Sequence, residues 1–155
     1  MSIYKSITGY GPRAKKNGRY YSILGPGLSR CIEDGDKFDD EDYRLGNYFL
    51  DEEVADRRAF VEAVSRKIFQ FSEYCAQIKP LDVTKPWYYV DMDVDGFFFK
   101  VASTSSDKRN WQVSYFAEEE DCVRAVKEIA EPMKNDYDKA TSDWLEWKAK
   151  QNKNK

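Results

Sequence analysis

The stretch DEEVADRRAFVEAVSRKIFQFSEYCAQI, residues 51–78, carries the strongest structural pattern in the chain. Asp51, Glu52 and Glu53 suit the positive N-terminal end of a helix, and Pro80 ends the helical pattern. The apolar side chains recur at the spacing of one helical face, at Val54, Val61, Val64, Ile68, Phe71, Cys75 and Ile78. We therefore expect one long central helix.

Short stretches rich in aromatic and β-branched residues lie on both sides of this helix and predict strands. Before the helix, we expect an acidic loop at residues 35–42 and strands at 19–24, 28–32 and 43–50. After the helix, a tight turn at Asp95-Gly96 joins the first two of three expected strands, at 87–94, 97–102 and 111–116.

A second helical pattern begins at residues 117–120, of which the last three are glutamates, and continues to about residue 150. Pro132 interrupts it, and proline disturbs a helix interior. We therefore expect either a kinked long helix or two helices that meet at Pro132. Its apolar face holds Cys122, Val126, Ile129, Met133, Tyr137, Ala140, Trp144 and Trp147. We expect this face to pack on the sheet, and the alternative for Trp144 and Trp147 is an exposed interaction surface or dimer seam.

The two halves of the chain match each other. Tyr20-Tyr21 corresponds to Tyr88-Tyr89, and Tyr48-Phe49 corresponds to Tyr115-Phe116. We interpret this as two repeated βββα units, and the alternative is coincidence in a chain with 11 tyrosines. The fold class is then α+β, an antiparallel sheet with the helices packed on one face. The units span residues 1–80 and 87–150 of one compact domain, and residues 151–155 form a flexible basic tail.

Composition narrows the function classes. Hydrophobic residues make up 41% of the 155 residues and charged residues 34%, which excludes a disordered chain and a membrane protein. The three widely spaced cysteines do not suggest a disulfide framework, and the N-terminus lacks the apolar core of a leader. We expect a cytoplasmic location with reduced thiols and no membrane contact.

Histidine is absent, which removes the usual catalytic triads and most zinc sites. No nucleophile has an evident activating partner in the sequence. We therefore expect no enzymatic activity and no cofactor, although a pair of catalytic carboxylates would need no histidine.

Charge is distributed in blocks. Residues 1–32 carry six basic residues and no acid, whereas residues 33–53 carry ten acids against two basic residues. The blocks either neutralise each other in the fold or present two opposite patches to partners. The acidic block is the first candidate site, as a docking patch for another protein with a basic surface. Its residues are Glu33, Asp34, Asp36, Phe38, Asp39, Asp40, Glu41, Asp42 and Tyr43. A solvated loop is the plainer alternative.

The basic block mixes cations with aromatic side chains, which is the combination that neutralises phosphates and stacks unpaired bases. It makes nucleic acid an alternative partner. The residues concerned are Arg13, Lys15, Lys16, Arg19, Tyr20 and Tyr21.

Asp91, Asp93 and Asp95 begin like a calcium loop, but Ala102 stands where an EF-hand needs its bidentate glutamate. Strand alternation places the three carboxylates on one solvated face. We therefore predict no metal site here, and a carboxylate-based metal-dependent enzyme is the third hypothesis.

No motif identifies a family. In its general character, charged and tyrosine-rich without a catalytic signature, the chain resembles the small accessory and host-takeover proteins of bacteriophages. That resemblance implies a non-enzymatic protein-binding module. Such a module would inhibit or redirect a host enzyme or defence complex by steric or charge-mimicking contact. The identity of the partner and the oligomeric state stay open.

Overall fold

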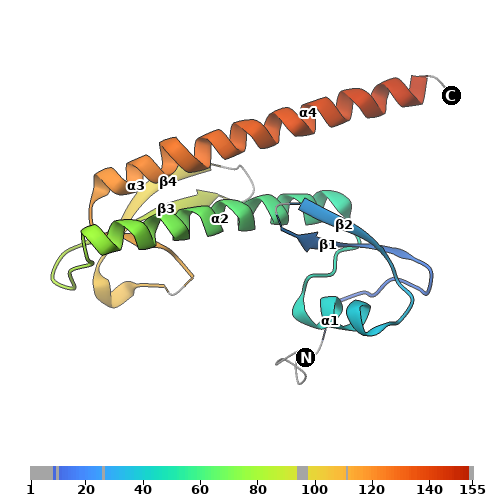
Figure 1. Ribbon diagram of the computed structural model, residues 1–155, viewed down its shortest axis with the longest axis horizontal. Helices are drawn as coiled ribbons and strands as arrows, with labels where there is room; N and C mark the ends of the chain where they lie inside the picture. The colour runs from blue at the N-terminus through green and yellow to red at the C-terminus, as the bar shows by residue number, and fades with distance from the viewer. Residues whose placement is uncertain (1–8, 10, 26, 94–97, 111, 154–155) are drawn as a thin grey trace. The chain divides into compact units, whose positions relative to one another are not determined.

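The computed structural model describes residues 9, 11–25, 27–93, 98–110 and 112–153. The chain divides into two compact units, Met1–Ala63 and Val64–Lys155, and the boundary falls inside the long helix α2, Glu52–Ile78. Figure 1 gives the element labels.

The first unit contains a two-stranded antiparallel hairpin and a short helix. Strand β1, Arg19–Leu24, pairs along its whole length with β2, Gly27–Ile32, as the sequence predicted. Helix α1, Lys37–Leu45, follows. Asn47 then covers the outer edge of β1, because its side chain accepts a hydrogen bond from the Ile23 N–H and donates one to the Ile23 carbonyl.

The predicted acidic loop at 35–42 and the predicted third strand at 43–50 are wrong. The Asp36 side chain accepts hydrogen bonds from the N–H groups of Phe38 and Asp39, which starts α1 inside the expected loop. Gly46, with φ 76°, ends α1 in the left-handed conformation inside the expected strand. A single antiparallel bridge between Tyr21 and Phe49 is what remains of strand pairing there.

The second unit contains a three-stranded antiparallel sheet in the order β4-β3-β5. Strand β3 spans Trp87–Asp93 and β4 spans Phe98–Thr104, close to their predicted ranges. A 3-10 turn, η1, spans Ser106–Lys108. Strand β5 is shorter than predicted, Tyr115–Phe116. The expected turn at Asp95-Gly96 lies outside the described residues.

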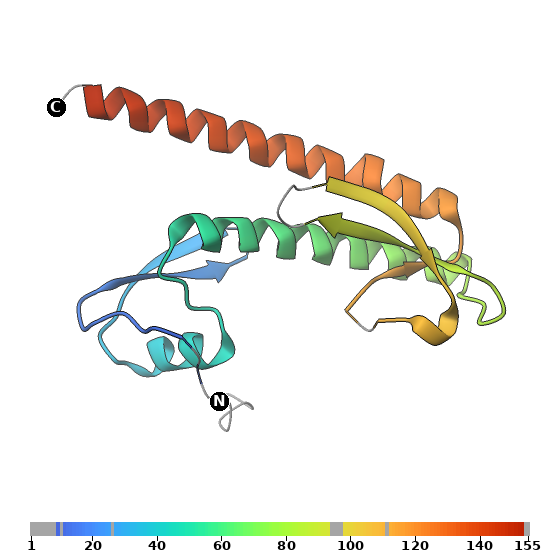
Figure 2. The same ribbon diagram turned by 180° about the vertical axis from the view of Figure 1, so that it is seen from behind.

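The last helix is continuous but contains a wide turn. Helix α3, Glu119–Ala125, leads into a π-helical segment, η2, Val126–Ala130, and then into α4, Glu131–Lys153 (Figure 2). In η2 the Glu131 N–H donates to the Val126 carbonyl, five residues back. Pro132 has no N–H, and in a regular α-helix its ring would crowd the carbonyl four residues earlier. The helix therefore passes Pro132 through this wide turn, and the predicted break into two separate helices is wrong.

The core confirms the predicted face of α2 only in part. Val64, Ile68 and Cys75 are buried, whereas Val54 and Ile78 are exposed. In the second unit, Phe71 of α2 meets Phe116 of β5 with ring centroids 5.8 Å apart. Helix α3 contacts all three strands, and Cys122 and Ala125 on it are fully buried.

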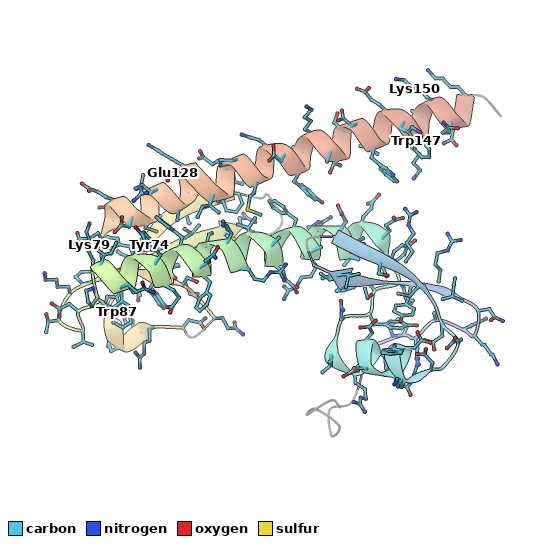
Figure 3. All side chains as sticks on the ribbon, in the orientation of Figure 1. Tyr74, Lys79, Trp87, Glu128, Trp147 and Lys150 are labelled. Atoms are coloured by element: carbon cyan, nitrogen blue, oxygen red, sulfur yellow. The ribbon has the colours of Figure 1, made fainter. Side chains whose placement is uncertain are left out.

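The expected packing of Trp144 and Trp147 on the sheet is wrong. No residue of α4 is buried, and Trp144 and Trp147 are 38% and 58% exposed. Figure 3 labels Trp147 near the end of α4, beyond the strands of this unit.

The fold is α+β, with two antiparallel sheets, a long helix and a C-terminal helix. The repeated βββα plan is not confirmed, because the first sheet has two strands and the second has three. The aromatic pairs that suggested a repeat occupy different structures: Tyr115-Phe116 is a strand, and Tyr48-Phe49 follows a helix.

Candidate functional site

One acid of the acidic block, Glu33, is buried in an ion pair with Arg13. Glu33 follows β2 and is only 4% exposed. Arg13 donates to both of its carboxylate oxygens, from Nε at 2.8 Å and from Nη2 at 2.9 Å, and Arg13 Nη1 reaches Asp40 Oδ1 at 2.6 Å. The guanidinium of Arg13 therefore holds the pKa of Glu33 below its usual value. The two oppositely charged blocks thus neutralise each other at Arg13, which is one of the two alternatives that the sequence left open.

Asp39 is the second buried acid. Burial by itself would raise its pKa, but the N–H groups of Asp34, Gly35 and Asp36 and the hydroxyl of Tyr20 donate to the carboxylate. These donors outweigh the desolvation and lower the pKa of Asp39 to about 2. Asp39 therefore holds the chain between β2 and α1 in place and is no free docking charge.

Tyrosines join the two buried acids. The rings of Tyr20 and Tyr48 stack with centroids 4.1 Å apart, and Tyr43 meets Tyr48 edge-on at 5.4 Å. The Tyr20 hydroxyl donates to Asp39 at 2.7 Å, and the Tyr48 hydroxyl donates to Glu33 at 2.7 Å. Burial, reinforced by the Glu33 hydrogen bond, raises the pKa of Tyr48 to about 12. Both phenols therefore stay protonated at neutral pH and act as donors.

The segment before β1 lies across these rings. Tyr43 donates its hydroxyl proton to the Gly11 carbonyl at 2.7 Å, and the Arg13 guanidinium lies 5.3 Å from the Tyr43 ring centroid. The Ala14 N–H donates to the Tyr48 hydroxyl at 3.0 Å. The segment that looked like a nucleic-acid contact is therefore partly used in holding the first unit together.

Some residues of the basic block make contacts inside the first unit, and others are exposed. Arg13 is paired and Tyr20 is buried, so neither is available to a nucleic acid. Tyr21 exchanges backbone hydrogen bonds with Phe49. Lys15, Lys16 and Arg19 are exposed.

The acidic block separates in the same way. Asp34 and Asp36 before α1, Phe38 on α1, and Asp40, which pairs with Arg13, are exposed. We define the α1 face as Asp34, Asp36, Phe38, the half-buried Glu41 and the exposed Leu45, which lies just beyond the block. Phe38 is 62% exposed and Leu45 is 46% exposed. Phe38, Glu41 and Leu45 follow one another at intervals of three and four, the spacing of neighbours on one helix face. Asp42 and Tyr43 are half-buried beside the Tyr20 and Tyr48 rings.

Three aspartate carboxylates lie close enough together to hold a metal ion. Oxygens of Asp34, Asp36 and Asp39 lie within 4.8 Å of one another. Hydrogen bonds account for this arrangement, because each of the three accepts from backbone N–H groups of the same turn. The aspartates that only weakly suggested a metal in the sequence lie elsewhere: Asp91 pairs with Lys100 across β3 and β4 at 3.2 Å, and Asp95 lies outside the described residues.

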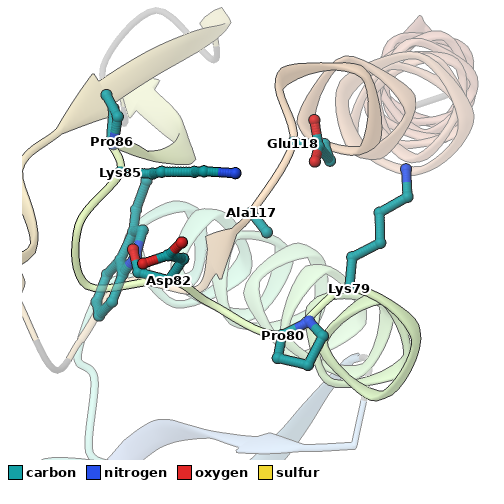
Figure 4. A pocket seen from close by; sticks show the side chains of 8 residues that line it. Lys79, Pro80, Asp82, Lys85, Pro86, Ala117 and Glu118 are labelled. Carbon is teal, nitrogen blue, oxygen red and sulfur yellow. The ribbon is translucent and has the colours of Figure 1, made fainter.

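A small pocket lies in the second unit, between the end of α2 and the start of α3 (Figure 4). Its volume is about 220 Å³, below the range typical of small-molecule sites. Lys79 and Lys85 line it together with Asp82 and Glu118, so its charges balance. Asp82 already accepts hydrogen bonds from Thr84. The pocket therefore has no unbalanced charge to select a ligand.

Two features of the site were missed from the sequence. Asp36 and Asp39 form a reciprocal capping box, which has a recognisable sequence spacing and could have predicted α1. Tyr48 was assigned to a strand, and no local signal shows that its ring stacks on Tyr20.

No known protein family model, curated protein or solved structure matches this chain. Within the part of the chain that the structure describes, no helix has both the length and the apolar character needed to cross a membrane.

Proposed function

We propose that the chain is a non-enzymatic protein-binding module that docks its α1 face on a basic surface of another protein. The observation that carries this proposal is the 62% exposure of Phe38, which follows the acidic residues Asp34 and Asp36 and has Lys37 Nζ 4.9 Å from its ring centroid. An exposed aromatic ring supplies an apolar anchor, and the surrounding acids steer a basic partner towards it.

The rigidity of α1 supports the same function. Asp36 caps the start of the helix, Gly46 ends it, and Asp39 fixes the preceding turn through three N–H donors. A surface that is ordered before binding loses little conformational entropy on docking. The α1 face is thus suited to bind as a rigid body.

The chemistry of the surface suggests the consequence of binding. A partner with a basic groove uses that groove for an acidic ligand of its own, and the α1 face would compete for it. The proposal therefore extends to inhibition or redirection of a target enzyme by steric or charge-mimicking contact. The alternative function is nucleic-acid binding. It has less support, because Arg13 and Tyr20 already make contacts inside the first unit.

The test compares two double variants with the wild type. Phe38→Ala with Glu41→Lys removes the anchor and reverses a charge on the α1 face. Phe69→Ala with Glu53→Lys makes the same chemical changes at exposed positions of α2. Asp39 and Asp42 are unsuitable for such a test, because their loss would disturb the Tyr20 contacts.

Each protein is used for affinity capture from the native host lysate after nuclease treatment. We expect the wild type and the α2 control to retain the same stoichiometric protein and the α1 variant to lose it, with a dissociation constant at least about tenfold higher. Equal retention by the α1 variant, or loss of all partners on nuclease treatment, would contradict the proposal.

A further inference from the structure

Helix α4 exposes two tryptophans, and no described residue of the second unit buries them. None of its residues from Glu131 to Lys153 is buried, and Trp144 and Trp147 are 38% and 58% exposed. Figure 3 shows the side chains of Trp147 and Lys150 on the last turns of this helix. Large exposed aromatic patches are typical of interaction surfaces and uncommon elsewhere.

The exposed apolar side chains have the spacing of a coiled-coil seam. Ala140, Trp144 and Trp147 follow one another at intervals of four and three residues, and Gln151 continues the pattern. Alternating intervals of four and three define the a and d positions that pack between two helices. The seam is therefore shaped for another helix.

The charges beside the seam are self-complementary. Asp136, Asp143 and Lys150 occupy the g positions on one side, and Lys134, Thr141 and Lys148 occupy the e positions on the other. In a parallel pair of identical helices, position g of one copy faces position e of the other five residues further on. Asp143 of each copy then faces Lys148 of the other copy, and two-fold symmetry forms this pair twice.

The antiparallel orientation would form a different pair. There g positions face g positions, so Asp143 of each copy would lie near Lys150 of the other instead of Lys148. Lys148 Nζ also lies 4.7 Å from the Trp144 ring centroid, in a cation–π contact.

We propose that residues 140–151 of α4 form a dimerisation surface that takes the same helix of a second copy of this chain in parallel. The proposal rests on the exposed seam and on the pairing of Asp143 with Lys148 of the other copy, and it is independent of the α1 face.

Two point variants test the seam on the full-length protein under reducing conditions. Trp147→Glu places a charge in the seam, and Leu145→Glu places the same charge on another side of the helix at a residue that is 53% exposed. In sedimentation equilibrium over a range of concentrations, we expect a monomer–dimer equilibrium for the wild type and for Leu145→Glu. For Trp147→Glu we expect a dissociation constant at least about tenfold higher.

Three outcomes would overturn the proposal. A wild type that stays monomeric at all concentrations would leave the seam to another protein or to the chain itself. A dimer that tolerates Trp147→Glu, or one that Leu145→Glu weakens equally, would place the interface elsewhere. Far-ultraviolet circular dichroism of each variant checks that α4 is intact.

Charge reversal tests the orientation. Asp143→Lys and Lys148→Asp should each weaken the dimer, because each creates two like-charged pairs. An equimolar mixture of the two single variants should associate as tightly as the wild type, because every pair is then attractive again. A mixture no tighter than either variant alone would contradict the parallel arrangement.

Discussion

Arg13 and Glu33 show how environment sets the importance of an ion pair. The side chains of Arg13 and Glu33 are 31% and 5% exposed, whereas those of the Arg30–Glu52 pair are 63% and 36% exposed. A buried carboxylate that loses its partner keeps its desolvation penalty, while an exposed one regains water. The two pairs therefore form a matched comparison within one unit.

We expect Arg13→Met to lower the free energy of unfolding of the first unit by about 3 kcal/mol. Arg30→Met should lower it by less than about 1 kcal/mol, because that pair is exposed. Urea unfolding followed through hydrogen exchange of the β1 and β2 amides measures both. Equal losses would mean that Glu33 is solvated in solution and that the Arg13 contact is weak.

The lowered pKa of Asp39 predicts how the stability of the first unit changes in acid. Its pKa is lowered to about 2 in the fold, despite burial, by the N–H donors and the Tyr20 hydroxyl. A lowered pKa stabilises the fold above the ordinary pKa of an aspartate, near 4, and this stability is lost as the pH falls towards 2.

We therefore expect the first unit to lose on the order of 2 kcal/mol between pH 4 and pH 2 through Asp39 alone. Asp39→Asn should make the unit less stable at pH 7 and flatten this part of the pH dependence. NMR of the Tyr20 and Tyr48 ring protons during acid titration is the measurement, because both residues lie in the first unit. An unchanged slope in Asp39→Asn would show that another carboxylate controls acid unfolding. Asp42 is distinguishable, because burial raises its pKa and gives its contribution the opposite sign.

At the scale of elements, α1 depends on how its ends are made. Gly46 has φ 76°, in the left-handed region, and an added Cβ there would meet nothing within 4 Å. The cost of a side chain at Gly46 is therefore the conformational strain alone. Gly27 offers a control, since it also has open space and no positive φ.

We expect Gly46→Ala to reduce the stability of α1 by about 1 kcal/mol and Gly27→Ala to have little effect. Hydrogen exchange at the Gly46 and Asn47 amides, which donate to the last turn of α1, reports the difference. If both variants behave alike, the helix does not end at Gly46 in solution.

The π-helical segment η2 lies directly before Pro132, a residue that does not fit the interior of a regular α-helix. Pro132 cannot donate a backbone hydrogen bond, and the wide turn of η2 stands directly before it. The helix therefore runs on into α4, which extends the exposed seam away from the sheet instead of ending it.

For the whole molecule, metal binding at the cluster of Asp34, Asp36 and Asp39 distinguishes the proposed non-enzymatic function from the metal-dependent alternative. We expect millimolar Mg²⁺, Mn²⁺ or Ca²⁺ to leave the Tm of the full chain unchanged, because backbone N–H groups already hold the three carboxylates. Differential scanning fluorimetry measures this. A rise in Tm that Asp34→Asn removes would support the metal-dependent hypothesis, whereas a general salt effect would persist in that variant.

Local patterns in the sequence were sufficient for several elements. The β1–β2 hairpin, the long helix α2 and the β3–β4 pair were all predicted close to their observed ranges. Alternation of side chains, helical spacing and turn residues act within a few residues, so a single stretch of sequence contains the whole signal. The capping signals of α1 are equally local. They were missed because the aromatic residues in 43–50 resemble a strand.

Tertiary structure alone decided the candidate site. Arg13, Glu33, Asp39 and Tyr48 are far apart in sequence, and the sequence does not show which acids Arg13 neutralises or which tyrosine stacks on Tyr20. The same holds for α4, whose helical spacing was evident while its exposure was not. Spacing shows which side chains share a face, but only the packed chain determines whether anything covers that face.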